Sequence, residues 1–192
     1  MSSASVLVDF IFITWLVFWT YWLIAAFGAK RSRQNTYGRF IGVRIVLFVV
    51  IVWLLRSSNR TRLWWDGHWL PHNSLPLEII GVVLFVAGLS LALWARLYLG
   101  KNWGMPMSEK DKPELVTSGP YRFVRHPIYT GVMFAALGTG LTVSLVWLLL
   151  FVFCAVYFTF SAFQEEKYLI RQFGKSYIEY RRRSKMLIPF VF

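Results

Sequence analysis

Long apolar segments constrain this chain more than any other feature of its sequence. A helix needs about 20 apolar residues to cross the hydrocarbon core of a bilayer. Five stretches approach or reach that length, namely residues 6–27, 40–55, 77–97, 128–143 and 145–163. The chain has 192 residues and is 57% hydrophobic, so it is too apolar and too short for several soluble domains. The sequence predicts an all-α integral membrane protein with about five transmembrane helices.

The break between the last two apolar segments is very short. Only LTVS separates Gly140 from Leu145, so the fourth and fifth helices are expected to form a tight hairpin. The small residues Gly138, Thr139 and Gly140 precede this break, and close helix packing is their expected role. A tight hairpin places the start of the fourth helix and the end of the fifth on the same side of the membrane.

Basic residues are concentrated between the apolar segments, and the formal net charge is +12. This distribution indicates anionic membrane lipids as partners rather than nucleic acid, because the charges do not line one soluble face. The connections after the first and third segments are more basic than the connection after the second. The positive-inside rule then places the N-terminus outside and the C-terminus in the cytoplasm.

The residues after Phe163 alternate apolar and basic side chains at roughly helical spacing. This pattern predicts an amphipathic cytoplasmic helix on or beneath the membrane domain, with Gly174 as a point of interruption and Pro189 as its end. We therefore divide the chain into an N-terminal three-helix region, 1–97, and a C-terminal region, 98–192. The two regions are expected to form one structural unit.

The sequence GPYRFVRHPIYTG, residues 119–131, concentrates polar groups at the start of the fourth apolar segment. Pro127 is suited to the first position of a helix, where no amide hydrogen is needed. The N-terminus of a helix carries free amides and a partial positive charge, which favour a phosphate or carboxylate ligand. His126 next to this proline is a candidate ligand-binding residue, although a histidine in this position is also a common helix cap.

Two adjacent acids, Glu165 and Glu166, follow the fifth apolar segment. They are candidates for binding an ammonium group or ribose hydroxyls. The alternative is a solvated pair that bridges to Lys167 or Arg171, since charges at the ends of membrane helices are common. The tight hairpin predicted above favours a shared site, because it brings the acid pair to the side of the membrane on which His126 lies.

No metal site is expected from the sequence. His68 and His72 lie near Asp66, but they lack the spacing of a helical zinc motif and a fourth ligand, and the tryptophans around them indicate a membrane interface. Cys154 is the single cysteine, so neither an internal disulfide nor a cysteine metal cluster can form.

Several motifs of the C-terminal half occur together in one known family. They are LGKNWG (99–104), ELVTSGPYRFVRHPIYTG (114–131), QEEKYLIRQFGKSYIEYRRR (164–183) and IPF (188–190). With them the chain resembles the isoprenylcysteine carboxyl methyltransferase family, which is similar to membrane phospholipid methyltransferases. The resemblance implies S-adenosylmethionine as cofactor, held by Pro113, Glu114, Leu115, Val116, Tyr121, His126, Pro127, Ile128, Tyr129 and Glu165.

The resemblance also implies methyl transfer to a membrane-embedded lipophilic acceptor, with a prenylcysteine carboxylate as one candidate. Positioning and exclusion of water can supply most of the acceleration of such a transfer. Glu166 is a candidate base for an amine or thiol acceptor, and Arg171 a candidate for attracting an anionic one. Eukaryotic members carry an arginine one turn before the cofactor glutamate, where this chain has Phe160, Ser161 and Ala162, which weakens the prenylcysteine assignment.

Three alternatives stay open from the sequence. The first is a phospholipid amine or thiol methyltransferase. The second is an NADPH-dependent membrane reductase, because sterol-reductase-like proteins share a similar C-terminal helical arrangement. The third is a non-enzymatic lipid-binding membrane subunit, which predicts no cofactor binding.

Overall fold

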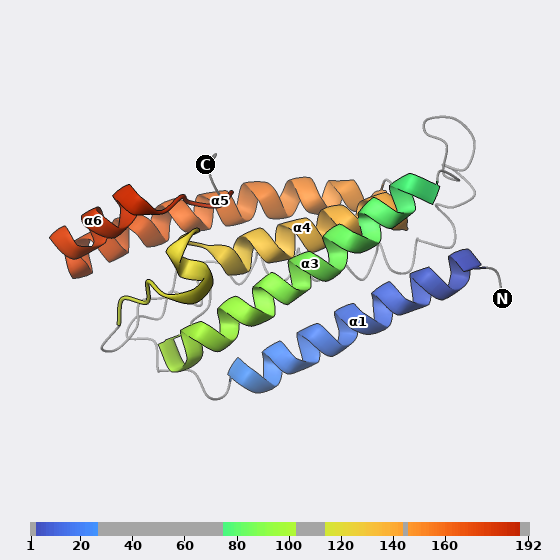
Figure 1. The fold of residues 1–192 in the computed structure, drawn as a ribbon, viewed down its shortest axis with the longest axis horizontal. Helices are drawn as coiled ribbons and strands as arrows, with labels where there is room; N and C mark the ends of the chain where they lie inside the picture. Colours follow the sequence, from blue (N-terminus) through green and yellow to red (C-terminus); the bar gives the residue numbers. More distant parts are fainter. Residues whose placement is uncertain (1–2, 27–74, 103–113, 144–145, 189–192) are drawn as a thin grey trace.

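The structure is a computed structural model that describes residues 3–26, 75–102, 114–143 and 146–188 (Figure 1). Its regular elements are helical: α1 (Ser3–Ala26), α3 (Leu75–Leu99), η2 (Gly100–Asn102), η3 (Gly119–Arg122), α4 (Pro127–Thr142), α5 (Val146–Phe173) and α6 (Lys175–Arg183). One isolated parallel β-bridge joins Val124 to Lys185. Within these ranges the all-α prediction is confirmed.

Three of the described helices are long and apolar enough to cross a membrane, judged by length and composition: Val6–Ala25, Leu75–Leu99 and Trp147–Phe173. α1 and α3 coincide with the first and third apolar segments of the sequence. α4 coincides with the fourth segment but has only 16 residues. The segment predicted at 40–55 lies outside the described residues.

The end of α5 differs from the prediction. We expected the fifth helix to end near Phe163 and a separate amphipathic helix to follow, but α5 continues to Phe173. Its last ten residues, QEEKYLIRQF, contain neither glycine nor proline, so nothing in them interrupts the helix. Gly174 ends it with a φ of +55°, a conformation that glycine adopts without steric penalty. The short helix α6 follows, and it buries Tyr177 and Tyr180.

α3 and α4 cross at very short range because glycines face each other. A Cβ added to Gly88 would lie 2.5 Å from the carbonyl oxygen of Gly131 and 2.6 Å from the amide nitrogen of Ala135. Small residues let helix backbones approach in this way inside membranes. Gly138 packs against Phe85 of α3, and Gly140 packs against Leu148 of α5. The packing role predicted for these small residues is thus confirmed.

α1 lies along α3 (Figure 1) and is tied to its neighbours by two polar contacts. Within the apolar region, Trp15 donates its indole N–H to the Thr139 hydroxyl at 3.0 Å. At the end of α1, the Arg96 guanidinium donates to the carbonyl of Ala25 at 2.9 Å. The last carbonyls of a helix have no partner within it, so Arg96 caps α1 from α3.

The predicted hairpin of α4 and α5 is present, and it brings the end of α5 to the start of α4. The ends of α1, α3 and α5 and the start of α4 lie at the same end of the molecule (Figure 1). The chain after α6 returns to the loop before α4, where the amides of Arg125 and His126 donate to the carbonyls of Lys185 and Met186 at 2.8 and 3.1 Å. This pairing closes one end of the helical bundle.

Candidate active site

The loop before α4 is held in place by packing against α3. Gly119 opens η3 with a φ of +58°, and a Cβ there would lie 2.5 Å from the ring of Tyr98. The following turn buries Pro120 and Tyr121. Pro127 is the first residue of α4, as the sequence predicted, and His126 occupies the N-cap position without a capping hydrogen bond from its side chain. The packing of the loop therefore fixes the position of His126 at the start of α4.

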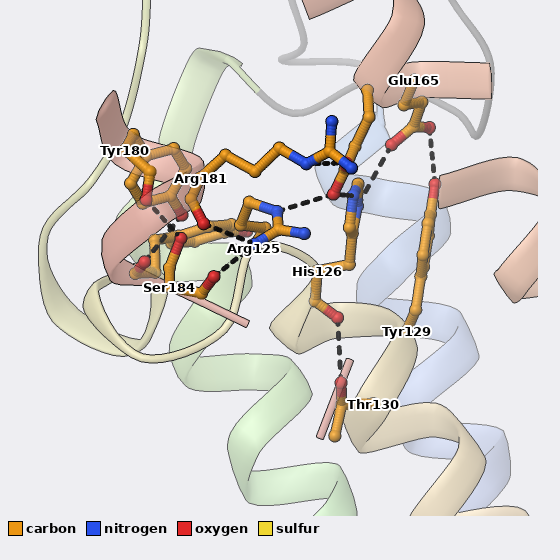
Figure 2. A network of polar contacts seen from close by, with 10 residues as sticks. Arg125, His126, Tyr129, Thr130, Glu165, Tyr180, Arg181 and Ser184 are labelled. Atoms are coloured by element: carbon orange, nitrogen blue, oxygen red, sulfur yellow. Dashed lines mark hydrogen bonds and ion pairs between the residues drawn. The ribbon is translucent and has the colours of Figure 1, made fainter. Parts of the chain in front are cut away.

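Glu165 of α5 lies beside His126 and Tyr129 at the start of α4 (Figure 2). The Tyr129 hydroxyl donates to Glu165 Oε1 at 2.6 Å. The His126 ring lies between the two acids, with Nδ1 3.5 Å from Glu165 Oε2 and Nε2 3.7 Å from Glu166 Oε1. The prediction that His126 and the acid pair share one location is confirmed.

Three basic side chains lie around Glu166, namely Arg125, Arg181 and His126. Arg125 Nε donates to its Oε1 at 2.6 Å, and Arg181 Nε lies 3.4 Å from its Oε2. The Arg125 and Glu166 side chains are only 8% and 4% exposed. Arg125 Nη1 also donates to the carbonyls of Arg181 and Ser184. The Arg125–Glu166 pair thus fastens the C-terminal segment to the loop before α4.

Glu165 differs from its neighbour in exposure and in its contacts. Its side chain is 23% exposed, and Tyr129 and His126 hold it. Burial lowers the pKa of His126, but the nearby carboxylates of Glu165 and Glu166 raise it, and the net effect is a pKa above the ordinary value. A protonated His126 places three cationic groups, with Arg125 and Arg181, against two carboxylates.

Aromatic rings connect this charged cluster to the apolar interior. The rings of His126 and Tyr129 stack with centroids 5.4 Å apart, and the rings of Tyr129 and Phe158 stack at 4.6 Å. Beyond them lies an apolar cluster between α4 and α5 that includes Met133, Trp147, Leu150, Cys154 and Ala162. A charged site and an apolar region therefore meet at Tyr129.

Tyr121 adds a buried hydroxyl beside this cluster. Its side chain is 6% exposed, and its hydroxyl has no hydrogen-bond partner among the residues that the structure describes. Burial, with smaller contributions from the neighbouring Tyr180 and Glu165, raises the pKa of Tyr121, so the phenol stays protonated and can donate. The backbone of the same residue is fixed, because the Tyr180 hydroxyl donates to its carbonyl at 2.6 Å.

The other predicted site residues occupy varied positions. Glu114, Leu115 and Val116 form an irregular stretch before η3, where Asn102 donates to Glu114 Oε2 at 3.2 Å. Pro127 is buried and Ile128 half-buried at the start of α4. Arg171 is exposed near the end of α5. Pro113 lies outside the described residues.

Sequence reasoning missed Arg125 as the partner of Glu166, and it missed Tyr177, Tyr180 and Ser184 of the C-terminal segment. Arg125 could have been found, because a buried acid needs a basic partner and Arg125 precedes His126 in the motif. The others depend on how the chain folds back after α5, which no local pattern specifies. In the described part of the chain, no group of three or more His, Cys, Asp or Glu side chains could hold a metal ion. His68, His72 and Asp66 lie outside that part.

Comparisons with known proteins identify the family. A family model described as phospholipid methyltransferase matches residues 77–176. The cobalt-zinc-cadmium resistance protein CzcN of Cupriavidus metallidurans is 34% identical over 84% of this chain and 69% of its own length. Protein-S-isoprenylcysteine O-methyltransferase of Xenopus laevis is 33% identical over 60% of this chain and 41% of its own length. The chain belongs to the phospholipid methyltransferase family, and the resemblance drawn from its motifs is confirmed.

A solved structure shares the fold. The eukaryotic intramembrane Ras methyltransferase ICMT superposes with a TM-score of 0.58 at 21% identity, covering 83% of this chain and 55% of that one. The membrane-protein assignment follows from this fold and from the apolar helices. The chain spans between about two fifths and two thirds of the lengths of the relatives named above.

Proposed function

We propose that the protein transfers a methyl group from S-adenosylmethionine to a lipophilic acceptor in the membrane, with a prenylcysteine carboxylate as the leading candidate. The observation that carries this proposal is the position of Glu165. It is a partly exposed carboxylate, held by Tyr129 and His126, at the boundary between a charged cluster and an apolar region. Such a boundary suits a charged donor and a lipid-soluble acceptor.

The residues present fit this cofactor. S-adenosylmethionine carries a sulfonium, an ammonium, a carboxylate and ribose hydroxyls. Glu165 can accept from the ammonium or a hydroxyl, the buried Tyr121 hydroxyl has a proton to donate, and the start of α4 favours a carboxylate. The rings of Tyr129 and Phe158 can add cation–π attraction of about 0.5 to 2 kcal/mol. Within this proposal the cofactor contacts also include His126, Pro127, Ile128 and the stretch from Pro113 to Val116.

When bound, the cofactor supplies an electrophilic methyl group. The chain's own residues bind, orient and exclude water, which suffices for an acceptor that is already ionised, such as a carboxylate. The contacts of Glu166 with Arg125 and Arg181 favour a positioning role over the role of a base. Arg171 stays a prediction, and its exposure near the end of α5 suits attraction of an anionic acceptor from outside the bundle.

The membrane arrangement that accompanies this function has about five spans and a cytoplasmic site. α1 and α3 run in the same direction (Figure 1), which supports a further span between them at 40–55. The basic connections support a cytoplasmic location for the start of α4. The exposed arginines of α6, Arg181 to Arg183, suit anionic headgroups. Regions 1–97 and 98–192 then work as one unit.

The direct test is methyl transfer by the purified protein in lipid nanodiscs. Radiolabelled S-adenosylmethionine is supplied with a farnesylated cysteine or with phospholipid vesicles. We expect label on the farnesylated cysteine, abolished by Glu165→Ala. Label on phospholipid alone would mean that the acceptor is a phospholipid and not a prenylcysteine. Binding of NADPH without any methyl transfer would favour the reductase. No label on either acceptor, with no cofactor binding, would reject methyl transfer.

A further inference from the structure

Tyr177 of α6 is the largest of the fully buried side chains that the structure describes. It is 1% exposed, and its ring packs edge-on against Tyr180 at 5.8 Å. Its hydroxyl is buried and has no hydrogen-bond partner in the ranges that the structure describes. The hydroxyl of Tyr180, by contrast, is used to hold the Tyr121 carbonyl.

A buried hydroxyl without a partner is unfavourable, because it has lost its water and gained nothing in return. Phenylalanine would fill the same space and make the same ring contact. The hydroxyl of Tyr177 therefore does not contribute to folding in the way that the hydroxyl of Tyr180 does. A role in binding explains why the side chain carries it.

The surroundings of this hydroxyl identify the kind of group it would meet. Burial raises the pKa of Tyr177, the charge of Glu166 raises it further, and Arg125 lowers it, so the phenol stays protonated and acts as a donor. Arg181 lies one turn further along α6, and its guanidinium contacts Glu166. When His126 is protonated, the positive charges of Arg125, Arg181 and His126 outnumber the two carboxylates Glu165 and Glu166. A carboxylate is the acceptor group that suits a phenol donor in this setting.

We propose that Tyr177 is a ligand-binding residue, and that its hydroxyl donates a hydrogen bond to a carboxylate group of a ligand bound beside the Arg125–Glu166 pair. This inference rests on the proposed methyl transfer. The carboxylate has two sources in that reaction, the methionine end of the cofactor and a carboxylate of the acceptor. In either case α6 contributes directly to the site and not only to its closure.

Tyr177→Phe tests the proposal, because it removes the hydroxyl and keeps the ring. Binding of S-adenosylmethionine and of its demethylated product is measured by calorimetry, and KM is measured with a farnesylated cysteine. We expect about a tenfold loss of affinity for one of these ligands, as for a hydrogen bond to a charged group. The thermal midpoint of the ligand-free protein should stay unchanged or rise. Tyr180→Phe should lower that midpoint, and Tyr168→Phe, on the half-buried part of α5, should change neither quantity.

The possible results distinguish the two sources of the carboxylate. They also distinguish this inference from the proposed methyl transfer. Weaker binding of both cofactor forms assigns the hydroxyl to the methionine carboxylate, and a raised acceptor KM with unchanged cofactor binding assigns it to the acceptor. Wild-type affinities and KM in Tyr177→Phe would overturn the inference and leave methyl transfer intact. A fall in its thermal midpoint equal to that of Tyr180→Phe would also overturn it. Absence of binding and transfer in the wild-type protein would instead reject the proposed function, and this inference with it.

Discussion

The crossing of α3 and α4 and the charged cluster at the start of α4 are built in opposite ways. At the crossing, glycines bring two backbones together, and a single added carbon would meet backbone atoms at 2.5 Å. At the cluster, long side chains meet through charges, with Arg125, Arg181 and His126 around Glu166. The crossing is sensitive to volume and the cluster is sensitive to charge. Substitutions can therefore separate what holds the membrane bundle together from what forms the site.

The largest effect is expected from Arg125→Met. It leaves Glu166 buried with its closest cation removed, and breaking such a pair destabilises proteins by about 3–5 kcal/mol. The free energy of unfolding in detergent, followed by circular dichroism, measures this loss. Arg182→Met, which removes an exposed arginine of α6, is the matched control and should change stability little. Equal losses in both variants would contradict the special role of the Arg125–Glu166 pair.

Gly88→Ala should cause the second largest loss of stability, because the new methyl group collides with the backbone of α4. Overpacking of this kind typically destabilises by about 1–3 kcal/mol. Ala87→Val adds more volume on the neighbouring exposed position of α3 and should be nearly neutral. The same unfolding measurement compares them. A stable Gly88→Ala variant would mean that the crossing is looser than described.

Tyr180→Phe should produce a smaller loss. It removes the hydrogen bond to the Tyr121 carbonyl and leaves a buried acceptor unsatisfied, which costs about 1 kcal/mol. Thermal denaturation of the ligand-free protein measures the change. An unchanged midpoint would show that the loop before α4 does not depend on α6.

The smallest expected effect is a pH dependence of stability that arises from His126. Its pKa is raised in the folded protein by Glu165 and Glu166, although burial opposes the shift. Its contribution to stability is therefore full below the unfolded pKa of about 6.5 and is lost as the pH rises through the folded pKa. Thermal midpoints should therefore fall from about pH 6 upward. His126→Gln should flatten this part of the profile, and an unaltered slope would contradict the assignment.

Much of the fold follows from the sequence. Apolar length predicted α1 and α3, and the LTVS break with Pro127 predicted the hairpin of α4 and α5 and hence the meeting of His126 with the acid pair. The predicted end of the fifth helix was wrong because apolar character ends at Phe163, while residues that favour a helix continue to Phe173. A loss of hydrophobicity marks the edge of a membrane segment but not the end of a helix.

The division of labour between Glu165 and Glu166 could not be predicted. The two acids are adjacent and of the same residue type, and only the return of the chain after α5 places Arg181 and the carbonyl of Ser184 around the Arg125–Glu166 pair. That return depends on backbone pairing between residues 123–126 and 185–186, which are far apart in sequence. Patterns within one segment carry no information about such pairing.

Binding of S-adenosylmethionine to Glu165→Gln tests the central claim most directly. Calorimetry on purified protein in nanodiscs compares it with the wild type and with Lys167→Gln, an exposed neighbour on α5. We expect the wild type and Lys167→Gln to bind alike, and Glu165→Gln to bind about tenfold more weakly or worse, because a charge-assisted contact is lost. Equal affinity of Glu165→Gln and the wild type would contradict the site described here.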